Sequence, residues 1–396
     1  MKPFIKTTLS NKYFIFFIWI SVALIASLKG SKVPNNFLIF KGVFFHAIEQ
    51  VNLFCRYPQE YADMNHYGPI FSLIIAPFTA FPDRIGMLLW NIVIVTSLYF
   101  AIFYLPIKWN TKLLIFYVPL LELFVTTANA QTNSLVAALI IGSFILIGKK
   151  KDFWAACLIA LGIFIKLYGI VGLCFFFFSK KKKQFILSLI FWSAMFFVLP
   201  MAISSPAFVV QSYFDWYESL VAKNIQNITQ FAQDISAIGL IRRVFDLLDI
   251  SALYIIVPGI ILFALQYVNT KKYTNLVFQL GILASALLFV ILFSTGSESP
   301  TYIIAIIGIC IWFCIQEQPY NKWILIFFII AAIWTSFATS YILPRDFRVD
   351  VVRRYSLKAI PSLMVWLLLV YQLISFRGLT KTVEENEEEK NINNSL

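Results

Sequence analysis

The sequence predicts an all-α, polytopic integral membrane protein with about twelve transmembrane helices, and three observations support this fold class. First, 60% of its 396 residues are hydrophobic and 13% are charged, whereas soluble domains are about 45–50% apolar and about 25% charged. Second, the mean hydropathy is +0.79, because long apolar stretches recur along the whole chain. Third, much of the net charge of +12 lies in short lysine runs between these stretches, as is typical of cytoplasmic loops. The composition therefore excludes a soluble protein, a disordered chain and a nucleic-acid-binding domain.

The apolar stretches give the candidate transmembrane helices, since about 20 apolar residues cross the hydrocarbon core of a bilayer. In chain order they are 13–28, 85–105, 113–127, 131–148, 153–165, 168–178, 184–203, 252–268, 274–294, 301–316, 323–343 and 358–376. We expect the first to be an uncleaved anchor, because the A-S-L-K-G sequence at its end is a poor cleavage site.

Lysine-rich segments predict which side of the membrane each loop occupies. The cytoplasmic positions are Lys2, Lys6, Lys12, Lys108, Lys112, 149–151, 180–183, 271 and 272. Because 153–178 starts and ends at such runs, it must return to its own side, so we expect two short helices that meet near Lys166. The proline-containing stretch 70–81 is too short for a crossing and predicts an interfacial or re-entrant helix on the outer face.

This topology places the long, chemically mixed loops on the extracytoplasmic side and the short, basic ones in the cytoplasm. The long outer loops are 29–84, 204–251 and 344–357. We expect one transmembrane domain over 1–378, followed by an acidic, disordered cytoplasmic tail over 379–396. The predicted location is the inner (plasma) membrane, with both termini in the cytoplasm and the functional face outside, where long loops on a rigid scaffold often carry function.

Carboxylates in the first outer loop are the candidates for a general base toward a sugar hydroxyl. They are Glu49, Glu60 and Asp63. Asp63 is preferred because it adjoins His66 and Tyr67, which are candidate sugar- or acceptor-binding residues. The alternative is that these charges only solvate a loop, as most surface charges do.

Two ionisable groups are expected at membrane depth, where burial of a charge is costly and functional use is common. Glu122 is followed by Gln131 and Asn133, which can bind a sugar or pack helices together. Lys166, beside Tyr168, requires an anion there, and this is either a lipid-linked phosphate or a protein carboxylate such as Glu122.

The later outer loops add further polar candidates. Asp234 and Glu298 are candidate sugar- or acceptor-binding residues. The last outer loop breaks the positive-inside pattern with four arginines, Arg345, Arg348, Arg353 and Arg354. Arginine pairs bidentately with phosphate oxygens, so we expect these residues to bind a phosphate-bearing lipid; nonspecific attraction to anionic membrane lipids is the alternative.

The absence of several nucleotide- and metal-binding motifs limits the reactions that this protein can catalyse. The sequence has no GxxxxGK[ST] loop, no HExxH and no Rossmann glycine fingerprint. Four of the five cysteines lie in apolar stretches, so neither a disulfide framework nor a zinc site is predicted. We expect no metal and no cofactor. Because no loop is long enough for a nucleotide-sugar domain, the donor of any sugar transfer should be lipid-linked.

Several motifs together resemble glycosyltransferase family 87, whose members are polytopic enzymes of the GT-C architecture. These motifs are NNFLIFKGVFFHAIEQ, HYGPIFSLIIAPF, NAQTNSLVAALI, FWAACLIALGIFIKLYGIVGL and STGSESPTYIIA. The similarity covers roughly residues 10–375, and it is strongest to a Bacteroidetes-type branch in which DWYxSL and QDIS recur.

The resemblance implies outer-face juxtamembrane helices and an inverting transfer of a mannose-like hexose or a pentose. The donor would be a polyprenyl-phosphate sugar, the acceptor a glycan or glycolipid, and Lys166 with the late arginines would hold the leaving phosphate. The sequence departs from the family at the proposed catalytic aspartate, where it has Asn36. A flippase or transporter of a lipid-linked sugar, and a polysaccharide polymerase or ligase, remain alternatives.

Overall fold

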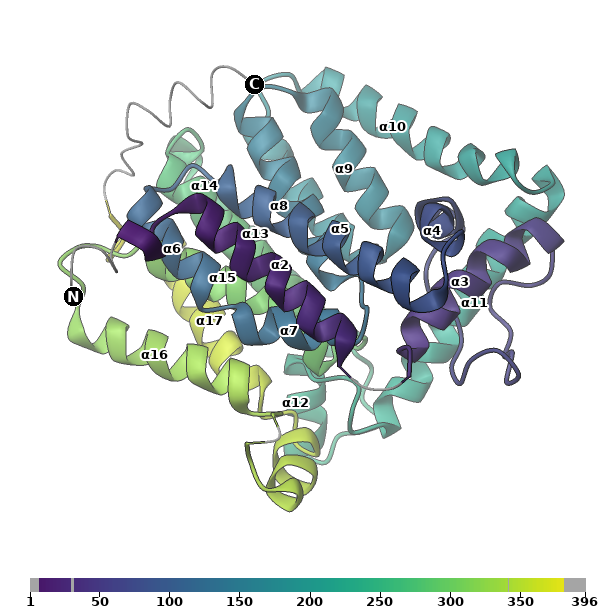
Figure 1. Ribbon diagram of the computed structural model, residues 1–396. Coiled ribbons are helices and arrows are strands. Elements are labelled where there is room, and N and C mark those ends of the chain that lie inside the picture. Colours follow the sequence, from purple (N-terminus) through teal and green to yellow (C-terminus); the bar gives the residue numbers. More distant parts are fainter. Residues whose placement is uncertain (1–6, 30–31, 341, 381–396) are drawn as a thin grey trace. The chain divides into compact units, whose positions relative to one another are not determined.

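The computed structural model describes residues 7–29, 32–340 and 342–380, and all regular structure within these ranges is helical (Figure 1). The chain forms two compact units. Unit 1 comprises Met1–Ala101 and Leu123–Lys223, and unit 2 comprises Ile102–Glu122 and Asn224–Leu396. The chain passes from one unit to the other within helices α5, α7 and α11.

Unit 1 contains the N-terminal helices and the middle of the chain. Its helices are α2 (Lys12–Leu28), α3 (Asn35–Glu49), α4 (Phe71–Thr79), α5 (Asp83–Phe103), most of α7 (Leu120–Ala128), α8 (Asn133–Gly148), α9 (Asp152–Ile165), η1 (Leu167–Phe178), α10 (Lys182–Val198), η2 (Leu199–Ala202) and most of α11 (Pro206–Thr229). Helix α9 packs against α8, η1 and α10, and α8 also packs against η1. Helix α2 begins where the Asn11 side chain accepts hydrogen bonds from the next helical N–H groups.

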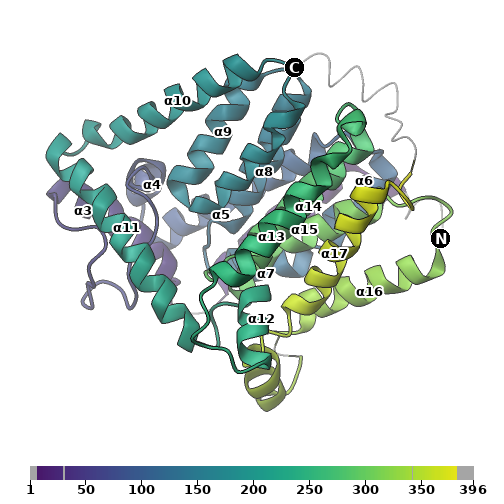
Figure 2. The same cartoon turned by 180° about the vertical axis from the view of Figure 1, so that it is seen from behind.

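Unit 2 is built around helices α14 and α15, whose side chains are almost all buried. Its elements are α6 (Trp109–Tyr117), α12 (Ala237–Val244), α13 (Leu253–Leu265), η3 (Gln266–Val268), η4 (Thr270–Lys272), α14 (Leu276–Leu292), η5 (Ser299–Thr301), α15 (Tyr302–Cys314), α16 (Lys322–Phe337), η6 (Phe347–Arg353) and α17 (Ala359–Ser375). The view in Figure 2 shows α13, α14 and α17 running beside one another.

The predicted apolar segments are helical, and most bounds agree within a few residues. The exceptions are 113–127, which is divided between α6 and α7, and 323–343, whose helix α16 ends at Phe337. Two helical segments are long and apolar enough to cross a membrane, Asp83–Phe103 and Lys182–Ala202. The pair α6 and α7, bent by 43°, makes a third if it is one broken span. The remaining apolar helices have 10–17 residues, so the count of about twelve crossings stays a prediction.

The broken hairpin predicted for 153–178 is present. Helix α9 ends at Ile165, Lys166 is extended, and a 3₁₀ helix follows. The two arms touch through glycines, because a Cβ on Gly169 would lie 2.3 Å from the carbonyl carbon of Gly162. The short helix predicted near 70–81 is α4, with Pro77 inside it. Helix α3, by contrast, was not assigned from the sequence.

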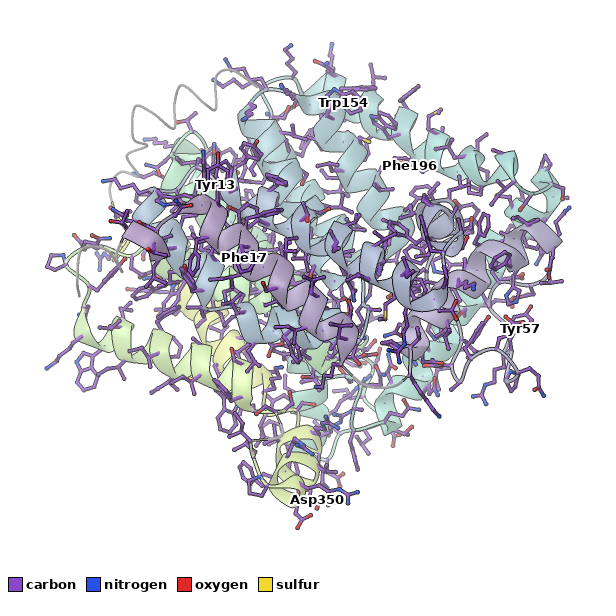
Figure 3. The ribbon with its side chains drawn as sticks, in the orientation of Figure 1. Tyr13, Phe17, Tyr57, Trp154, Phe196 and Asp350 are labelled. Carbon is purple, nitrogen blue, oxygen red and sulfur yellow. The ribbon has the colours of Figure 1, made fainter. Side chains whose placement is uncertain are left out.

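Large apolar side chains cover the outer surfaces of many helices (Figure 3). Tyr13 is 74% exposed and Phe17 is 66% exposed on α2, and Trp154 on α9 also points outward. A soluble protein rarely leaves so much apolar area in water, whereas a bilayer accepts it. The surface and the apolar helices are therefore those of an integral membrane protein.

Candidate active site

The segment 61–68 in unit 1 is held against α9 and α11 by its backbone. The Gly68 amide donates to the Ile165 carbonyl at 3.2 Å, and the Trp216 indole donates to the His66 carbonyl at 2.9 Å. A Cβ on Gly68 would lie 2.1 Å from the Phe164 carbonyl oxygen, so only glycine allows this approach. These contacts fix Asp63, His66 and Tyr67 relative to two helices.

Asp63 has an accessible carboxylate, with a side chain that is 50% exposed. Its Oδ1 accepts from the Met64 amide at 2.8 Å, and its Oδ2 lies 3.6 Å from the Nζ of Lys223 on α11. The carboxylate is therefore oriented by the chain and remains open to a substrate.

The imidazole of His66 lies beside this carboxylate. Its Nδ1 is 2.8 Å from the Ser219 hydroxyl, while its Nε2 is buried and has no hydrogen-bond partner among the described residues. Burial and the charge of Lys223 lower the pKa of His66 to about 4, with a further lowering by Lys166 and an opposing effect from Asp63. His66 is therefore neutral at pH 7.

Polar side chains from the start of α8 and the end of α9 lie in the same unit. Thr132 donates to the Tyr67 hydroxyl at 3.3 Å. Lys166 Nζ donates to Asn133 Oδ1 at 3.1 Å and lies 4.5 Å from the centre of the Tyr168 ring. Asn133 in turn donates to Gln131. A contiguous chain of contacts thus links several candidates that were predicted from separate motifs.

The other acids of the first loop have different surroundings. Glu60 lies 3.1 Å from the Nε2 of buried His46, whose ring contacts Tyr57 at a centroid distance of 3.9 Å. Glu49 is exposed at the last position of α3. Glu60 is therefore held by an imidazole, whereas Asp63 lies beside the polar groups described above.

Asn36, where the resemblance implied a catalytic aspartate, has a structural contact in this protein. Its amide donates to the Asn129 carbonyl at 2.8 Å. The neighbouring Asn35 accepts from the amide of Ala62 at 2.7 Å, one residue before Asp63. This asparagine pair therefore connects α3 to the turn before α8 and to the candidate carboxylate.

In unit 2, Glu122 forms a buried ion pair. Lys358 Nζ lies 2.9 Å from Glu122 Oε1, and both side chains are 1% exposed. Lys358 also donates to the Ser299 and Thr339 hydroxyls at 3.0 and 3.3 Å. The cation bound by Glu122 is thus Lys358, and not Lys166, which was one possible partner of Glu122 on sequence grounds.

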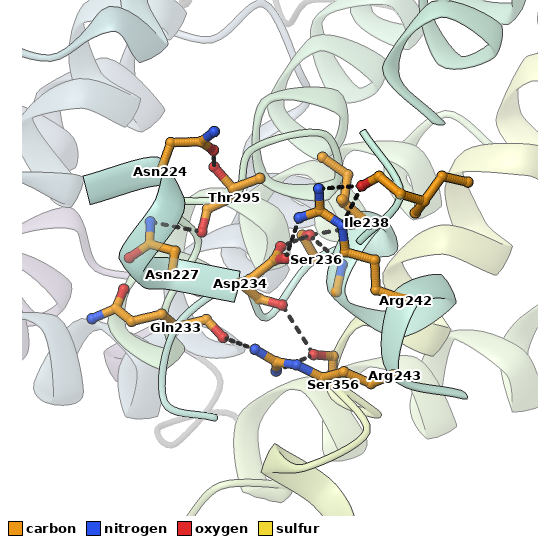
Figure 4. Close-up of polar contacts among 12 residues, drawn as sticks. Asn224, Asn227, Gln233, Asp234, Ser236, Ile238, Arg242, Arg243, Thr295 and Ser356 are labelled. Atoms are coloured by element: carbon orange, nitrogen blue, oxygen red, sulfur yellow. Dashed lines mark hydrogen bonds and ion pairs between the residues drawn. The ribbon is translucent and has the colours of Figure 1, made fainter. Parts of the chain in front are cut away.

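Asp234 also lies within a protein network, shown in Figure 4. Its carboxylate accepts from Ser236 and lies 3.5 Å from Arg242. The adjacent Arg243 donates to the Ser356 hydroxyl and to three backbone carbonyls. Burial raises the pKa of Asp234 to about 6, against the lowering effects of Ser236 and the two arginines. Asp234 is thus an internal partner for arginine.

The remaining candidates of unit 2 lie at helix starts and in the last outer segment. Glu298 caps η5 through a reciprocal contact with Thr301. Arg348 is buried and donates to the Ser340 carbonyl at 3.2 Å. Arg345 and Arg354 are exposed, and Arg353 is half-buried. Because Arg345 and Arg354 are exposed, their guanidinium groups can reach an anion outside the protein.

Three residues near the candidate site were not predicted from the sequence, namely Trp216, Ser219 and Lys223. All lie on α11 at intervals of three and four residues, which places them on one helix face. That spacing, within and after the DWYESL motif, is the signal that could have identified them. In the described part of the chain, no three His, Cys, Asp or Glu side chains gather in a way that would hold a metal ion.

The helical fold, the apolar surface and the polar cluster of unit 1 define an integral membrane protein with a candidate active site. The sequence matches the model of glycosyltransferase family 87 over residues 65–340. The chain belongs to this family and is a glycosyltransferase. The match includes His66, Lys166 and Lys223, whereas Asp63 and the arginines from Arg345 onward lie outside it. No curated protein matches the chain in sequence.

Proposed function

We propose that the enzyme transfers a mannose-like hexose or a pentose from a polyprenyl-phosphate sugar to a glycan or glycolipid at the extracytoplasmic face. The family supplies the reaction class. The membrane character supports a donor that resides in the bilayer, and the sequence contains no nucleotide-binding motif. The outer-face location rests on the lysine distribution.

The observation that supports this function best is the half-exposed carboxylate of Asp63 beside cationic and hydroxyl-binding side chains of the same unit. In the proposed reaction Asp63 removes the proton of the acceptor hydroxyl. The acceptor oxygen then forms a bond to the anomeric carbon on the face opposite the leaving group. The bond from that carbon to the phosphate oxygen breaks, and polyprenyl phosphate leaves with the electron pair, which gives inversion.

The surrounding residues have roles that follow from their chemistry. Lys166 attracts the phosphate through its ammonium group, and Tyr168 stabilises that cation by a cation–π contact. Tyr67, Gln131 and Asn133 offer hydroxyl and amide groups to sugar hydroxyls. The contact of Glu60 with His46 makes Asp63 the preferred base, with Glu60 and Glu49 as the remaining candidates.

Residues of unit 2 are proposed to serve the lipid and the acceptor. The exposed Arg345 and Arg354 suit the phosphate of a lipid head group. The Arg348 side chain, which donates to the Ser340 carbonyl, and the backbone carbonyl of Arg353, which accepts from Arg243, hold the segment that presents them. Glu122, Asp234 and Glu298 were predicted to bind sugar directly; their contacts with Lys358, Arg242 and Thr301 support an indirect role instead.

The function is tested with the purified protein in lipid nanodiscs. We expect sugar transfer from a polyprenyl-phosphate hexose in the presence of a chelator, and none from a nucleotide sugar. Asp63→Asn should lower kcat by about a hundredfold or more, the usual effect of losing a general base, while the variant folds normally. Glu218→Gln, an exposed acid on α11, is the matched control and should keep full activity. Transfer that needs a nucleotide sugar would refute the proposal.

A further inference from the structure

Two lysines in unit 1 interact electrostatically with the imidazole of His66. Lys166 stands at the junction between α9 and η1, and Lys223 lies on α11. Both act on His66 electrostatically in the direction that disfavours its protonated form. Among the described residues, Asp63 is the carboxylate that acts on the ring in the opposite direction. Two ammonium groups and one carboxylate therefore act on His66, an excess of positive charge.

The ammonium group of Lys223 lacks hydrogen bonds to the described residues. Its side chain is 14% exposed, and it forms an ion pair with Asp63, whose Oδ2 lies 3.6 Å from Nζ. This distance exceeds that of an N–H···O hydrogen bond, which is about 2.7–3.2 Å. An ammonium group has three N–H donors, and leaving them unmatched in a mostly buried position is unfavourable. The geometry therefore leaves donors available for a ligand.

The Nε2 atom of His66 is also buried and lacks a partner among the described residues. The Ser219 hydroxyl, 2.8 Å from Nδ1, can donate to that nitrogen. The ring proton then sits on Nε2, which becomes a neutral donor near the two lysines. A ligand that accepts hydrogen bonds and carries negative charge matches these groups, and a phosphate group does both.

We propose that Lys223, together with Lys166 and the Nε2–H of His66, forms the site that binds the phosphate group of the lipid-linked donor. This assignment rests on the proposed function and adds Lys223 as a phosphate ligand. Lys223 then contacts the phosphate while its ammonium group stays within ion-pair distance of the Asp63 carboxylate.

The chain offers a direct readout of this site because it has two histidines, His46 and His66. Protein with ¹⁵N-labelled histidine in detergent gives two imidazole signal sets, which His46→Asn assigns. The probes are a short isoprenyl monophosphate and inorganic phosphate. We expect either probe to shift the His66 signals and raise its pKa, because a nearby anion stabilises the imidazolium form. Tighter binding of the isoprenyl phosphate identifies the lipid donor as the source of the phosphate.

The test variant is Lys223→Met, which keeps the length of the side chain and removes its charge. We expect probe affinity to fall about tenfold or more, the usual effect of losing a charge-assisted hydrogen bond, and KM for the donor to rise similarly. Lys41→Met is the matched control, because Lys41 in the same unit is already paired with Asp83 at 2.6 Å. That variant should bind the probes as the wild type does.

Two failures are distinguishable. If Lys223→Met binds the probes as tightly as the wild type, or if neither probe perturbs His66, the phosphate site is refuted even when the enzyme transfers sugar from a polyprenyl-phosphate donor. If the probes bind and Lys223→Met weakens them, but the wild type transfers no sugar from that donor, the phosphate site stands and the proposed function is refuted.

Discussion

Asp234 is a buried acid whose environment controls its protonation. The carboxylate is 1% exposed and lies between Ser236 and Arg242. Burial raises the pKa above its ordinary value, to about 6, because desolvation outweighs the attraction of the arginines. A folded-state pKa above the unfolded one means that the folded protein holds this proton more tightly. The associated stability is present at low pH and is lost as the pH rises through about 6.

We therefore expect Asp234→Asn to remove a pH-dependent part of the stability. As the pH falls from 7 to 4, the wild type should gain on the order of 3 kcal/mol relative to the variant. Thermal unfolding in detergent over this pH range measures the difference. Parallel pH profiles for the two proteins would show that Asp234 does not titrate in this way.

At the scale of elements, the start of α17 is tied to Glu122 of α7 and to Thr339, which follows α16. The ion pair of Lys358 with Glu122 and the bond from Lys358 to Thr339 form this connection. Lys358 immediately precedes α17 and follows the arginine-bearing segment in sequence. Burial of two opposite charges is tolerated because each compensates the other, whereas a single one is not. The pair therefore fixes the end of the segment that carries the exposed arginines.

Removing one member of this pair should destabilise unit 2 strongly. Glu122→Gln leaves a buried ammonium group, and we expect a loss of about 3–5 kcal/mol. The double variant Glu122→Gln with Lys358→Met should recover part of that loss, because no unpaired charge remains. Chemical unfolding in mild detergent compares the variants, with the exposed Glu317→Gln as a control that should change stability by less than about 0.5 kcal/mol. Additive effects of the two substitutions would argue against coupling.

For the whole molecule, the sidedness of the loops decides where the chemistry takes place. Cys55, in the first predicted outer loop, is exposed and unpaired, whereas Cys310 and Cys314 are buried. The lysine run 180–183 is predicted to face the cytoplasm. A membrane-impermeant thiol reagent therefore separates the two faces without any change to the fold.

We expect Cys55 of the wild type to be labelled by an impermeant maleimide on intact cells. In a Cys55→Ser background, Arg345→Cys should be labelled from outside, and Lys181→Cys only after the cells are permeabilised. Mass spectrometry of the purified protein measures the modification. Labelling of Lys181→Cys on intact cells, or protection of Arg345→Cys from the reagent, would contradict the proposed topology.

The sequence by itself determined the helical class, the family resemblance and the position of most helices. Apolar segment length and proline or lysine boundaries are local properties, so they predicted α5 and the break at Lys166 within a few residues. They did not predict α3, because its polar and aromatic residues lack a strong periodic pattern. The number of membrane crossings remained a prediction, since many of the apolar helices are shorter than a full span.

Only the tertiary structure decided which polar groups meet. The His66–Ser219 contact joins residues 153 positions apart, and the Glu122–Lys358 pair joins residues 236 positions apart. Such pairings depend on how the helices pack. A buried charged residue needs a partner, but its residue type alone does not predict which residue that partner is. The sequence therefore showed which charged residues need partners, and the packing of each unit determined those partners. Glu122 and Asp234 are buried and paired within the protein, whereas the carboxylate of Asp63 is accessible.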